Sequence, residues 1–198
     1  IQFDPESSRA HTLLGLVLLS EKHLQAARTE FEWVLQRDPT REDAYFNLGR
    51  VAYYEKKYSK AVGEYQLALK TAAGSYPEAQ LNLGLTYSAM KDYPAALAAY
   101  DAALKSKRQY PEAWYNMGIV HMRMKDSKKA EEAFKAAVRL RPDYEQAWFN
   151  LGVLFGNTDR DSEAMDAYRK ALSIRPDYHQ AQLNLAVRHA RSNEFGEA

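Results

Sequence analysis

The sequence predicts an all-α fold, a right-handed superhelical solenoid of antiparallel helix pairs. Two observations support this prediction: small and aromatic residues recur with a period close to 34 residues, and polar turns with helix-capping residues divide each period into two segments. No stretch of useful length alternates polar and apolar residues as a half-buried strand would. We therefore expect about five full helix pairs, with partial repeats at both ends.

Glycine marks the period most clearly. Successive glycines are separated by 34, 35, 34 and 34 residues, at Gly15, Gly49, Gly84, Gly118 and Gly152. An alanine follows each glycine after 12 residues and an aromatic residue follows after 16, as Ala130 and Phe134 follow Gly118. Antiparallel helices that approach closely need small residues at the contact and a large one beside them. We expect each aromatic ring to fill the space next to its glycine.

Helix-capping residues mark where the helices begin. Ser75, Asp143 and Asp177 each have Glu or Gln three residues later, which predicts capping boxes at the start of three first helices. Within a repeat, a polar turn separates the two helices. Asp92 is placed to cap the second helix, with Pro94 in its first turn.

This punctuation predicts a single array over 1–198. The expected segments are a tail of a preceding repeat at 1–7, full repeats at 8–41, 42–76, 77–110, 111–144 and 145–178, and a partial repeat at 179–198. The second repeat has one extra residue near Gly74, which predicts an irregular exit turn. Ala198 takes the place of the small residue of a second helix, so both termini resemble cuts within a longer array.

The pattern resembles the tetratricopeptide repeat, in which a large residue is followed by Leu-Gly, Tyr, Ala, an aromatic residue, Ala and Pro. The fifth repeat has Trp148, Leu151, Gly152, Phe155, Ala164, Tyr168, Ala171 and Pro176 at these places. The sequence also departs from the pattern: Gln80 and Gln182 replace the large residue, and His121 and His189 replace the Tyr. The resemblance covers almost the whole chain. It implies a module for protein–protein interaction that catalyses nothing itself.

Composition argues against several other classes of function. The chain has 27 Lys and Arg against 26 Asp and Glu, so it lacks the positive electrostatic field that would attract nucleic acid. It has no cysteine and no apolar run of the roughly 20 residues that membrane insertion needs. Phosphate loops and metalloprotease or hydrolase motifs are absent. We predict no metal, no cofactor and no enzyme activity, and interpret His121 and His189 as partly buried imidazoles. The compartment stays open, with the cytoplasm favoured.

Candidate binding residues lie on the first helices, which line the concave side in the fold that the resemblance implies. An asparagine precedes the Leu-Gly place in five successive repeats, at Asn47, Asn82, Asn116, Asn150 and Asn184. An asparagine side chain donates and accepts at once, so a row of them can pair with the backbone of an extended peptide. This ladder is similar to that of the O-linked N-acetylglucosamine transferases. Alternatively, the asparagines serve local helix packing.

The residues one place before and three places after each asparagine share its face of the helix. They are mostly apolar and include Phe46, Leu81, Tyr115 and Phe149, while Arg50, Tyr53 and Arg123 add polar groups. We predict a groove that binds a peptide or helix of another protein. Co-chaperone members of the family carry a basic clamp for a C-terminal dicarboxylate, where this chain has Asp43, Glu78, Glu112, Gln146 and Gln180. A basic or neutral partner segment is therefore expected.

Two other interpretations stay open. In one, the chain is a scaffold that self-associates by docking an end or a convex face into the groove of another copy. In the other, it is the substrate-recognition arm of an enzyme whose catalytic domain lies outside this segment.

Overall fold

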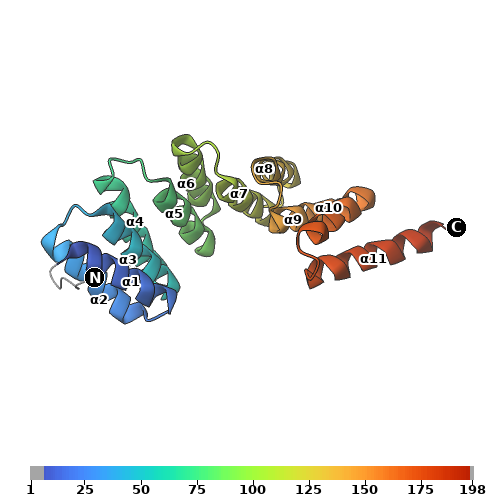
Figure 1. Ribbon diagram of the computed structural model, residues 1–198. Helices are drawn as coiled ribbons and strands as arrows, with labels where there is room; N and C mark the ends of the chain where they lie inside the picture. The colour runs from blue at the N-terminus through green and yellow to red at the C-terminus, as the bar shows by residue number, and fades with distance from the viewer. Residues whose placement is uncertain (1–6, 197–198) are drawn as a thin grey trace. The chain divides into compact units, whose positions relative to one another are not determined.

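The computed structural model describes the backbone of residues 7–196 and the side chains of residues 7–191. Over this range the fold is all-α, with eleven helices and no strand, as predicted (Figure 1). The chain divides into two compact units, Ile1–Arg108 and Gln109–Ala198, which we describe in turn. Among the helices described, none combines the length and the apolar character that crossing a bilayer requires.

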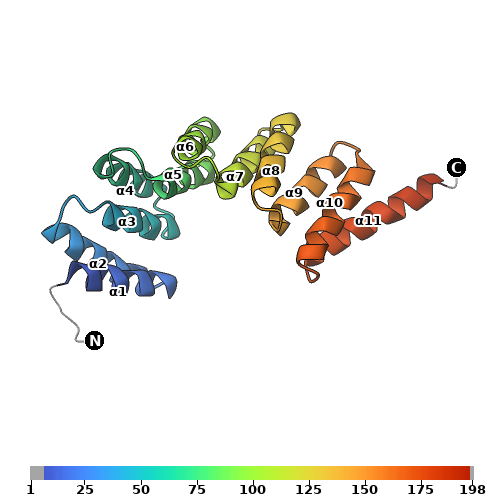
Figure 2. The ribbon, with the colours of Figure 1, turned by 45° about the horizontal axis from the view of Figure 1, so that its top comes forward.

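The first unit consists of three helix hairpins. Each helix packs against the next one along the chain, and the short turns make neighbours antiparallel (Figures 1 and 2). Its helices are α1 (Ser8–Ser20), α2 (Leu24–Arg37), α3 (Glu42–Tyr54), α4 (Tyr58–Thr71), α5 (Pro77–Ala89) and α6 (Tyr93–Ser106).

The second unit has two hairpins followed by a longer helix. Successive helices again pack against one another. They are α7 (Pro111–Arg123), α8 (Ser127–Leu140), α9 (Glu145–Gly156), α10 (Asp161–Ile174) and α11 (His179–Gly196).

Each hairpin closes on the predicted contact between a glycine and an aromatic ring. A Cβ atom added to Gly84 would lie 2.4 Å from Cε1 of Tyr100, and one added to Gly118 would lie 2.5 Å from Cε1 of Phe134. The recurring alanines, such as Ala130, are fully buried beside these rings. The periodic residues are therefore those that let two helices approach closely, as the sequence predicts.

The turn inside each hairpin uses a residue in the left-handed region of φ. These residues are Lys22, Lys56, Lys91, Lys125 and Asp159, with φ between 54° and 64°. The N–H of the following residue donates to the carbonyl five positions earlier, as Asp92 does to Tyr87 at 2.9 Å. This bond satisfies a carbonyl at the end of the first helix. The left-handed turn residue itself stands where helices usually have glycine.

The predicted helix caps are only partly right. Asp92 caps α6 and accepts from the N–H of Ala95 at 3.2 Å, as expected. The capping boxes at Ser75 and Asp143 are wrong, because α5 and α9 begin one residue later and their N-cap residues are tyrosines without side-chain caps. The third box, at Asp177, would have needed α11 to start directly after it, whereas α11 starts at His179.

A side-chain hydrogen bond fixes the segment before three of the first helices. In each, a side chain in the first turn donates to a loop carbonyl six residues earlier: Gln80 Nε2 to Gly74 at 3.1 Å, Trp148 Nε1 to Pro142 at 2.9 Å and Gln182 Nε2 to Pro176 at 2.7 Å. Just before α5, Ala73 and Gly74 both have positive φ, so the exit turn of that repeat is irregular as predicted.

The expectations for the two ends fall partly outside the described residues. The tail at 1–7 and the position of Ala198 lie there, apart from Ser7, the N-cap residue of α1. α11 runs unbroken through Gly196, although the other first helices have 12 or 13 residues and then turn. In the five hairpins, the left-handed turn residue costs free energy, and packing of the second helix offsets that cost. Within the described range no second helix follows α11.

Candidate functional site

Within each unit, the predicted asparagines lie on one face of the first helices, which we call the asparagine face of that unit. In the first unit, Asn47 is buried, with its Nδ2 donating to the carbonyl of Asp43 at 2.8 Å. Its Oδ1 accepts from Arg50 Nη1 at 2.9 Å. Asn82 is half-buried and donates to the carbonyl of Glu78 at 2.8 Å. The structure therefore occupies both functional groups of Asn47 but only the amino group of Asn82.

The second unit carries three asparagines on this face. Asn116 donates to the carbonyl of Glu112 at 2.7 Å, and Asn150 donates to that of Gln146 at 2.9 Å. Asn150 also donates to the hydroxyl of Tyr115 on α7 at 3.1 Å, which links two first helices. Asn184 donates to the hydroxyl of Tyr168 at 3.4 Å, and all three are half-buried. Among the described residues, none donates to the Oδ1 atoms of these asparagines.

The apolar residue before each asparagine packs between repeats. Ring centroids of Phe46 and Tyr76 lie 5.1 Å apart in the first unit. In the second unit, Tyr115 pairs with Tyr144 and Phe149 pairs with Tyr178, both at 4.9 Å.

The apolar residues that precede the asparagines therefore belong largely to the core. Leu81 is buried as well, and the rings of Phe46, Tyr115 and Phe149 are half-buried. Burial also raises the pKa of Tyr76 and of Tyr144 to about 12. The predicted apolar surface is narrower than the sequence suggested, because each tyrosine at the start of a first helix covers the ring of the preceding repeat.

The polar groups expected at the groove differ between the units. Arg50 and Tyr53 are half-buried on α3, where Tyr53 contacts the rings of Tyr54 and Tyr58. Tyr54 is 55% exposed. Arg123 is exposed at the end of α7 in the second unit.

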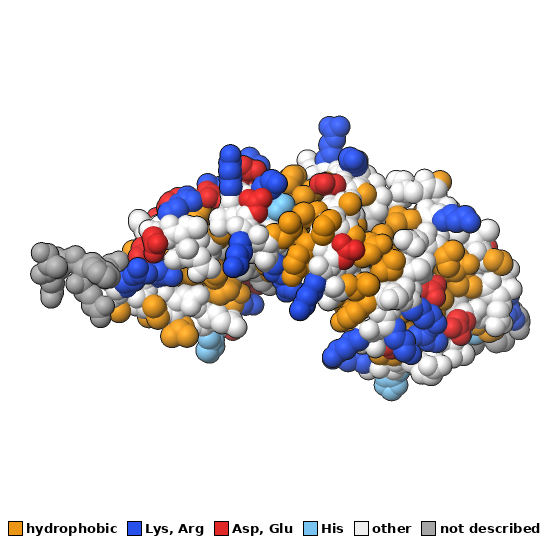
Figure 3. Space-filling model, turned by 180° about the vertical axis from the view of Figure 1, so that it is seen from behind, with side chains coloured by type: hydrophobic (Ala, Val, Ile, Leu, Met, Phe, Trp, Pro, Cys, Tyr) orange, Lys and Arg blue, Asp and Glu red, His pale blue; other side chains and the backbone are white. Residues whose placement is uncertain are grey.

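The acidic residues at the start of the first helices are paired. Arg41 Nη2 lies 2.7 Å from Asp43, Lys107 Nζ lies 3.8 Å from Glu78, and Arg141 Nη1 lies 2.9 Å from Glu112. These cations partly neutralise the acidic residues. The acidic rim from which the sequence predicts a basic or neutral partner segment is therefore weaker in the structure. On the face drawn in Figure 3, Lys and Arg side chains lie interspersed with acidic and hydrophobic ones.

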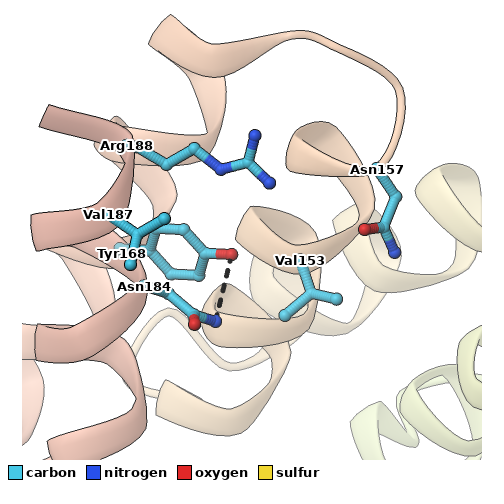
Figure 4. Close-up of a pocket in the computed structure, with 6 residues that line it drawn as sticks. All are labelled: Val153, Asn157, Tyr168, Asn184, Val187 and Arg188. Atoms are coloured by element: carbon cyan, nitrogen blue, oxygen red, sulfur yellow. Dashed lines mark hydrogen bonds between the residues drawn. The ribbon is translucent and has the colours of Figure 1, made fainter. Parts of the chain in front are cut away.

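A pocket lies between α9, α10 and α11 of the second unit. It has a volume of about 160 Å³ and is lined by Val153, Asn157, Tyr168, Asn184, Val187 and Arg188 (Figure 4). Arg188 Nη1 lies 2.7 Å from Asp161 Oδ1. Sequence reasoning missed Arg188, although a comparison of the repeats would have identified it: it takes the place of Leu154 and Val120, which are buried and apolar.

The two histidines at the tyrosine place of the repeat have different environments. His121 is buried, and His189 is exposed with its Nε2 3.4 Å from Nη2 of Arg169. Both histidines were predicted to be partly buried. His121 is more buried than predicted, and His189 is less buried. Within the described part of the chain, no three His, Asp or Glu side chains are grouped as metal ligands would be.

Comparison with known proteins agrees with the geometry of the hairpins. The sequence profile of the tetratricopeptide repeat matches residues 12–79, 81–145 and 115–179. Among curated proteins, the chain is 30% identical over 112 residues to the type IV pilus assembly protein PilF of Pseudomonas aeruginosa. That alignment covers 54% of this chain and 43% of PilF, so the chain spans less than half of that relative.

Solved structures show the same fold at lower identity. A structure from the functional characterization of Pseudomonas aeruginosa pilF has a TM-score of 0.84 and 24% identity, covering 94% of this chain and 84% of that one. YrrB, described as a TPR protein with an unusual peptide-binding site, has a TM-score of 0.69 and 21% identity, covering 96% and 94%. Because the family profile matches most of the sequence, the chain belongs to the tetratricopeptide repeat family, whose members act as protein–protein interaction modules.

Proposed function

We propose that this chain is a non-catalytic module in which the asparagine face of each unit holds an extended segment of a partner protein. The observation that supports this most directly is the state of four asparagine side chains. Their amino groups donate within the chain, while their Oδ1 atoms have no donor among the described residues; they are Asn82, Asn116, Asn150 and Asn184.

An extended peptide offers the N–H groups that such oxygens accept. The bond from Nδ2 to the helix's own carbonyl holds the amide of Asn116 and of Asn150 in one orientation before a ligand arrives. Such preorganisation lowers the entropy that binding costs. Backbone pairing of this kind gives affinity without requiring a particular peptide sequence.

Apolar side chains beside the asparagines would supply further contact. Ile119 and Val153 of the second unit are half-buried and lie three residues after Asn116 and Asn150. A half-buried aliphatic side chain still has surface to remove from water, at about 25 cal/mol per Å². The second unit is thus suited to a segment with aliphatic side chains, and the first unit to one with polar groups near Arg50.

Selection of binding peptides tests this proposal. We would select random 12-residue peptides against the chain and measure their affinities for the parent and for the double variant Asn116→Ala/Asn150→Ala. Each lost hydrogen bond contributes about 0.5 to 1.5 kcal/mol, so we expect affinity to fall about tenfold. Glu132→Ala on the exposed side of α8 is the matched control and should bind like the parent.

Circular dichroism should show equal helicity in all three proteins. Peptides that bind the double variant as tightly as the parent would show that the asparagines serve only packing. Failure to select any peptide would contradict peptide binding by this face.

Self-association is a second candidate, supported by apolar side chains that are more than half exposed. Leu13 and Val17 on α1 are 56% and 53% exposed, and Leu183 and Val187 on α11 are 65% and 54% exposed. Contiguous apolar surface of this kind is typical of contact sites. Light scattering across a hundredfold concentration range would decide, because a constant monomer mass excludes this candidate.

A further inference from the structure

The pocket between α9, α10 and α11 differs from every equivalent place in the chain. We propose that it binds a carboxylate group of the partner segment through the guanidinium of Arg188, an inference that rests on the proposed function and names a chemical group of the ligand.

The place of Arg188 is otherwise uncharged, and it is buried in four of the five preceding repeats. Val51, Thr86, Val120 and Leu154 hold it there and are at most 4% exposed, whereas Val17 of the first repeat is 53% exposed. An arginine here brings a charge to a position that elsewhere packs between helices. Charge at a buried place is costly unless it is compensated, so its presence needs an explanation in this repeat.

A second departure accompanies the first. Gly156 takes the place that Leu19, Tyr53, Ser88 and Met122 hold in the other repeats. A Cβ atom at Gly156 would lie 2.6 Å from Nη2 of Arg188 and 2.9 Å from its Cζ. The glycine therefore removes the side chain that would collide with the guanidinium. The two unusual residues are in contact, and the guanidinium that Gly156 accommodates lines the pocket.

The guanidinium has unused hydrogen-bonding capacity. Nη1 donates to Asp161 Oδ1 at 2.7 Å, and the side chain is only 18% exposed. Within the described residues, Nε and Nη2 of Arg188 have no acceptor. Nε and Nη2 form one edge of the guanidinium, whose two parallel N–H groups match the two oxygens of a carboxylate. A neutral carbonyl would satisfy only one of them.

Other polar groups converge on the same space. The hydroxyl of Tyr168 accepts from Asn184 Nδ2 at 3.4 Å, so its own O–H is available to donate. In Figure 4 the side chains of Arg188 and Tyr168 approach the pocket from one side, and those of Asn157 and Val153 lie across from them. The pocket holds about 160 Å³, far more than the roughly 10 to 15 Å³ that one water needs. A carboxylate-bearing side chain or a chain terminus fits.

The test uses small carboxylates as probes, titrated into the whole chain and followed by NMR at the side-chain amides of Asn157 and Asn184 and at Nε–H of Arg188. N-acetylalanine carries a terminal carboxylate, and N-acetylaspartate N-methylamide carries only a side-chain carboxylate. Their neutral counterparts are N-acetylalanine N-methylamide and N-acetylasparagine N-methylamide. We expect at least one carboxylate to bind about tenfold more tightly than its neutral counterpart, since a bond to a charged group contributes about 1.5 to 3 kcal/mol.

Which carboxylate binds identifies the source. Saturation by N-acetylalanine alone assigns the pocket to a C-terminus, and saturation by the aspartate probe assigns it to a side chain. Equal binding of the neutral probes would overturn the proposal. Inorganic phosphate that binds more tightly than either carboxylate would also overturn it, because the pocket would then be a general anion site.

Two variants connect the binding to Arg188. Arg188→Leu gives this place the residue type of Leu154, so the fold should persist while carboxylate affinity falls about tenfold or more. Arg139→Leu, at an exposed arginine of α8 in the same unit, is the matched control and should bind like the parent. Unchanged carboxylate affinity in Arg188→Leu would exclude the proposed contact.

The probe titration is independent of the partner peptide. The double variant Asn116→Ala/Asn150→Ala lacks two residues of the asparagine face but keeps every residue that lines the pocket. If it binds N-acetyl probes normally and loses selected peptides, both proposals stand. If it loses peptides while no variant binds any carboxylate, only the carboxylate inference fails.

Discussion

The two units use the same packing inside their hairpins but differ on the asparagine face at one helix. In the first unit, α3 presents Arg50, Tyr53 and Tyr54, while α5 has the half-buried Leu85 at the place of Arg50. In the second, Ile119 and Val153 are half-buried aliphatic residues at the corresponding face. Contacts between helices therefore restrict the glycine and aromatic places, whereas the places that face outward from the hairpin are open to variation.

The largest expected effect breaks the packing that the two units share. Gly84→Ala in the first unit and Gly118→Ala in the second each place a Cβ within 2.4 or 2.5 Å of a buried ring. The ring must shift, because it is fully enclosed. Overpacking of this kind should lower the free energy of unfolding by about 1 to 3 kcal/mol in each case. Urea denaturation followed by circular dichroism measures it.

Gly63→Ala is the matched control for these variants. Gly63 lies within α4, and a Cβ there would have no neighbour within 4 Å. An alanine should therefore raise stability by about 0.5 to 1 kcal/mol, since glycine is a poor helix former. A loss of stability in Gly63→Ala equal to that in Gly84→Ala would contradict the steric explanation.

Alkaline pH should act on the tyrosines that begin first helices. Burial raises the pKa of Tyr76 in the first unit and of Tyr144 in the second to about 12. The unfolded chain loses these protons near pH 10, so their contribution to stability is complete below that pH. It is lost as the pH rises from about 10 through 12, because ionisation then favours the unfolded state.

Replacing either ring hydroxyl isolates this contribution from that of the lysines. Tyr76→Phe and Tyr144→Phe should each make the fall of the unfolding free energy above pH 10 shallower, by similar amounts. Urea denaturation at several values between pH 7 and 11.5 measures the slope. A slope that neither variant changes would exclude these tyrosines as its cause.

Two tyrosines at equivalent places sharpen the contrast between the units. The hydroxyl of Tyr65 is buried and has no hydrogen-bond partner in the described part of the chain, whereas that of Tyr168 accepts from Asn184. Tyr65→Phe should therefore raise stability by about 1 kcal/mol, and Tyr168→Phe should lower it by about 0.5 kcal/mol. Thermal unfolding should move in opposite directions; equal shifts would show that Asn184 contributes nothing.

The hairpin contacts were predictable because they depend on spacing alone. Gly118 and Phe134 are in contact because their separation in sequence places them opposite each other in one hairpin. No contact with another repeat is needed to predict this. The caps at Ser75 and Asp143 could not be placed as reliably. A shift of one residue at the helix start moves the side chain away from the N–H groups, and here Tyr76 and Tyr144 take the N-cap position.

The asparagine face was predictable in part, for a similar reason. The period placed Asn116 and Asn150 on one face, but it could not show that Asn150 also bonds to Tyr115 or that Asn47 is buried. Those facts depend on how neighbouring repeats pack. The pocket at Arg188 could not be predicted from the period, because the period describes recurring residues and Arg188 departs from it.

The smallest expected effect concerns the turns, where both units use the same unusual backbone. Lys91 in the first unit and Lys125 in the second have φ of 64° and 61°. A non-glycine residue pays about 1 to 2 kcal/mol in this region, while glycine costs about 0.5 to 1 kcal/mol more entropy on folding. Lys91→Gly and Lys125→Gly should each raise stability by about 0.5 kcal/mol.

Lys170→Gly supplies the control, because Lys170 is exposed in the interior of α10 and the same replacement there should cost about 1 kcal/mol. Thermal unfolding of the three variants, measured together, gives the signs. Equal gains in Lys91→Gly and Lys125→Gly would show that the turn is relieved in the same way in both units. A loss at either position would mean that the lysine side chain stabilises that turn by more than its backbone conformation costs.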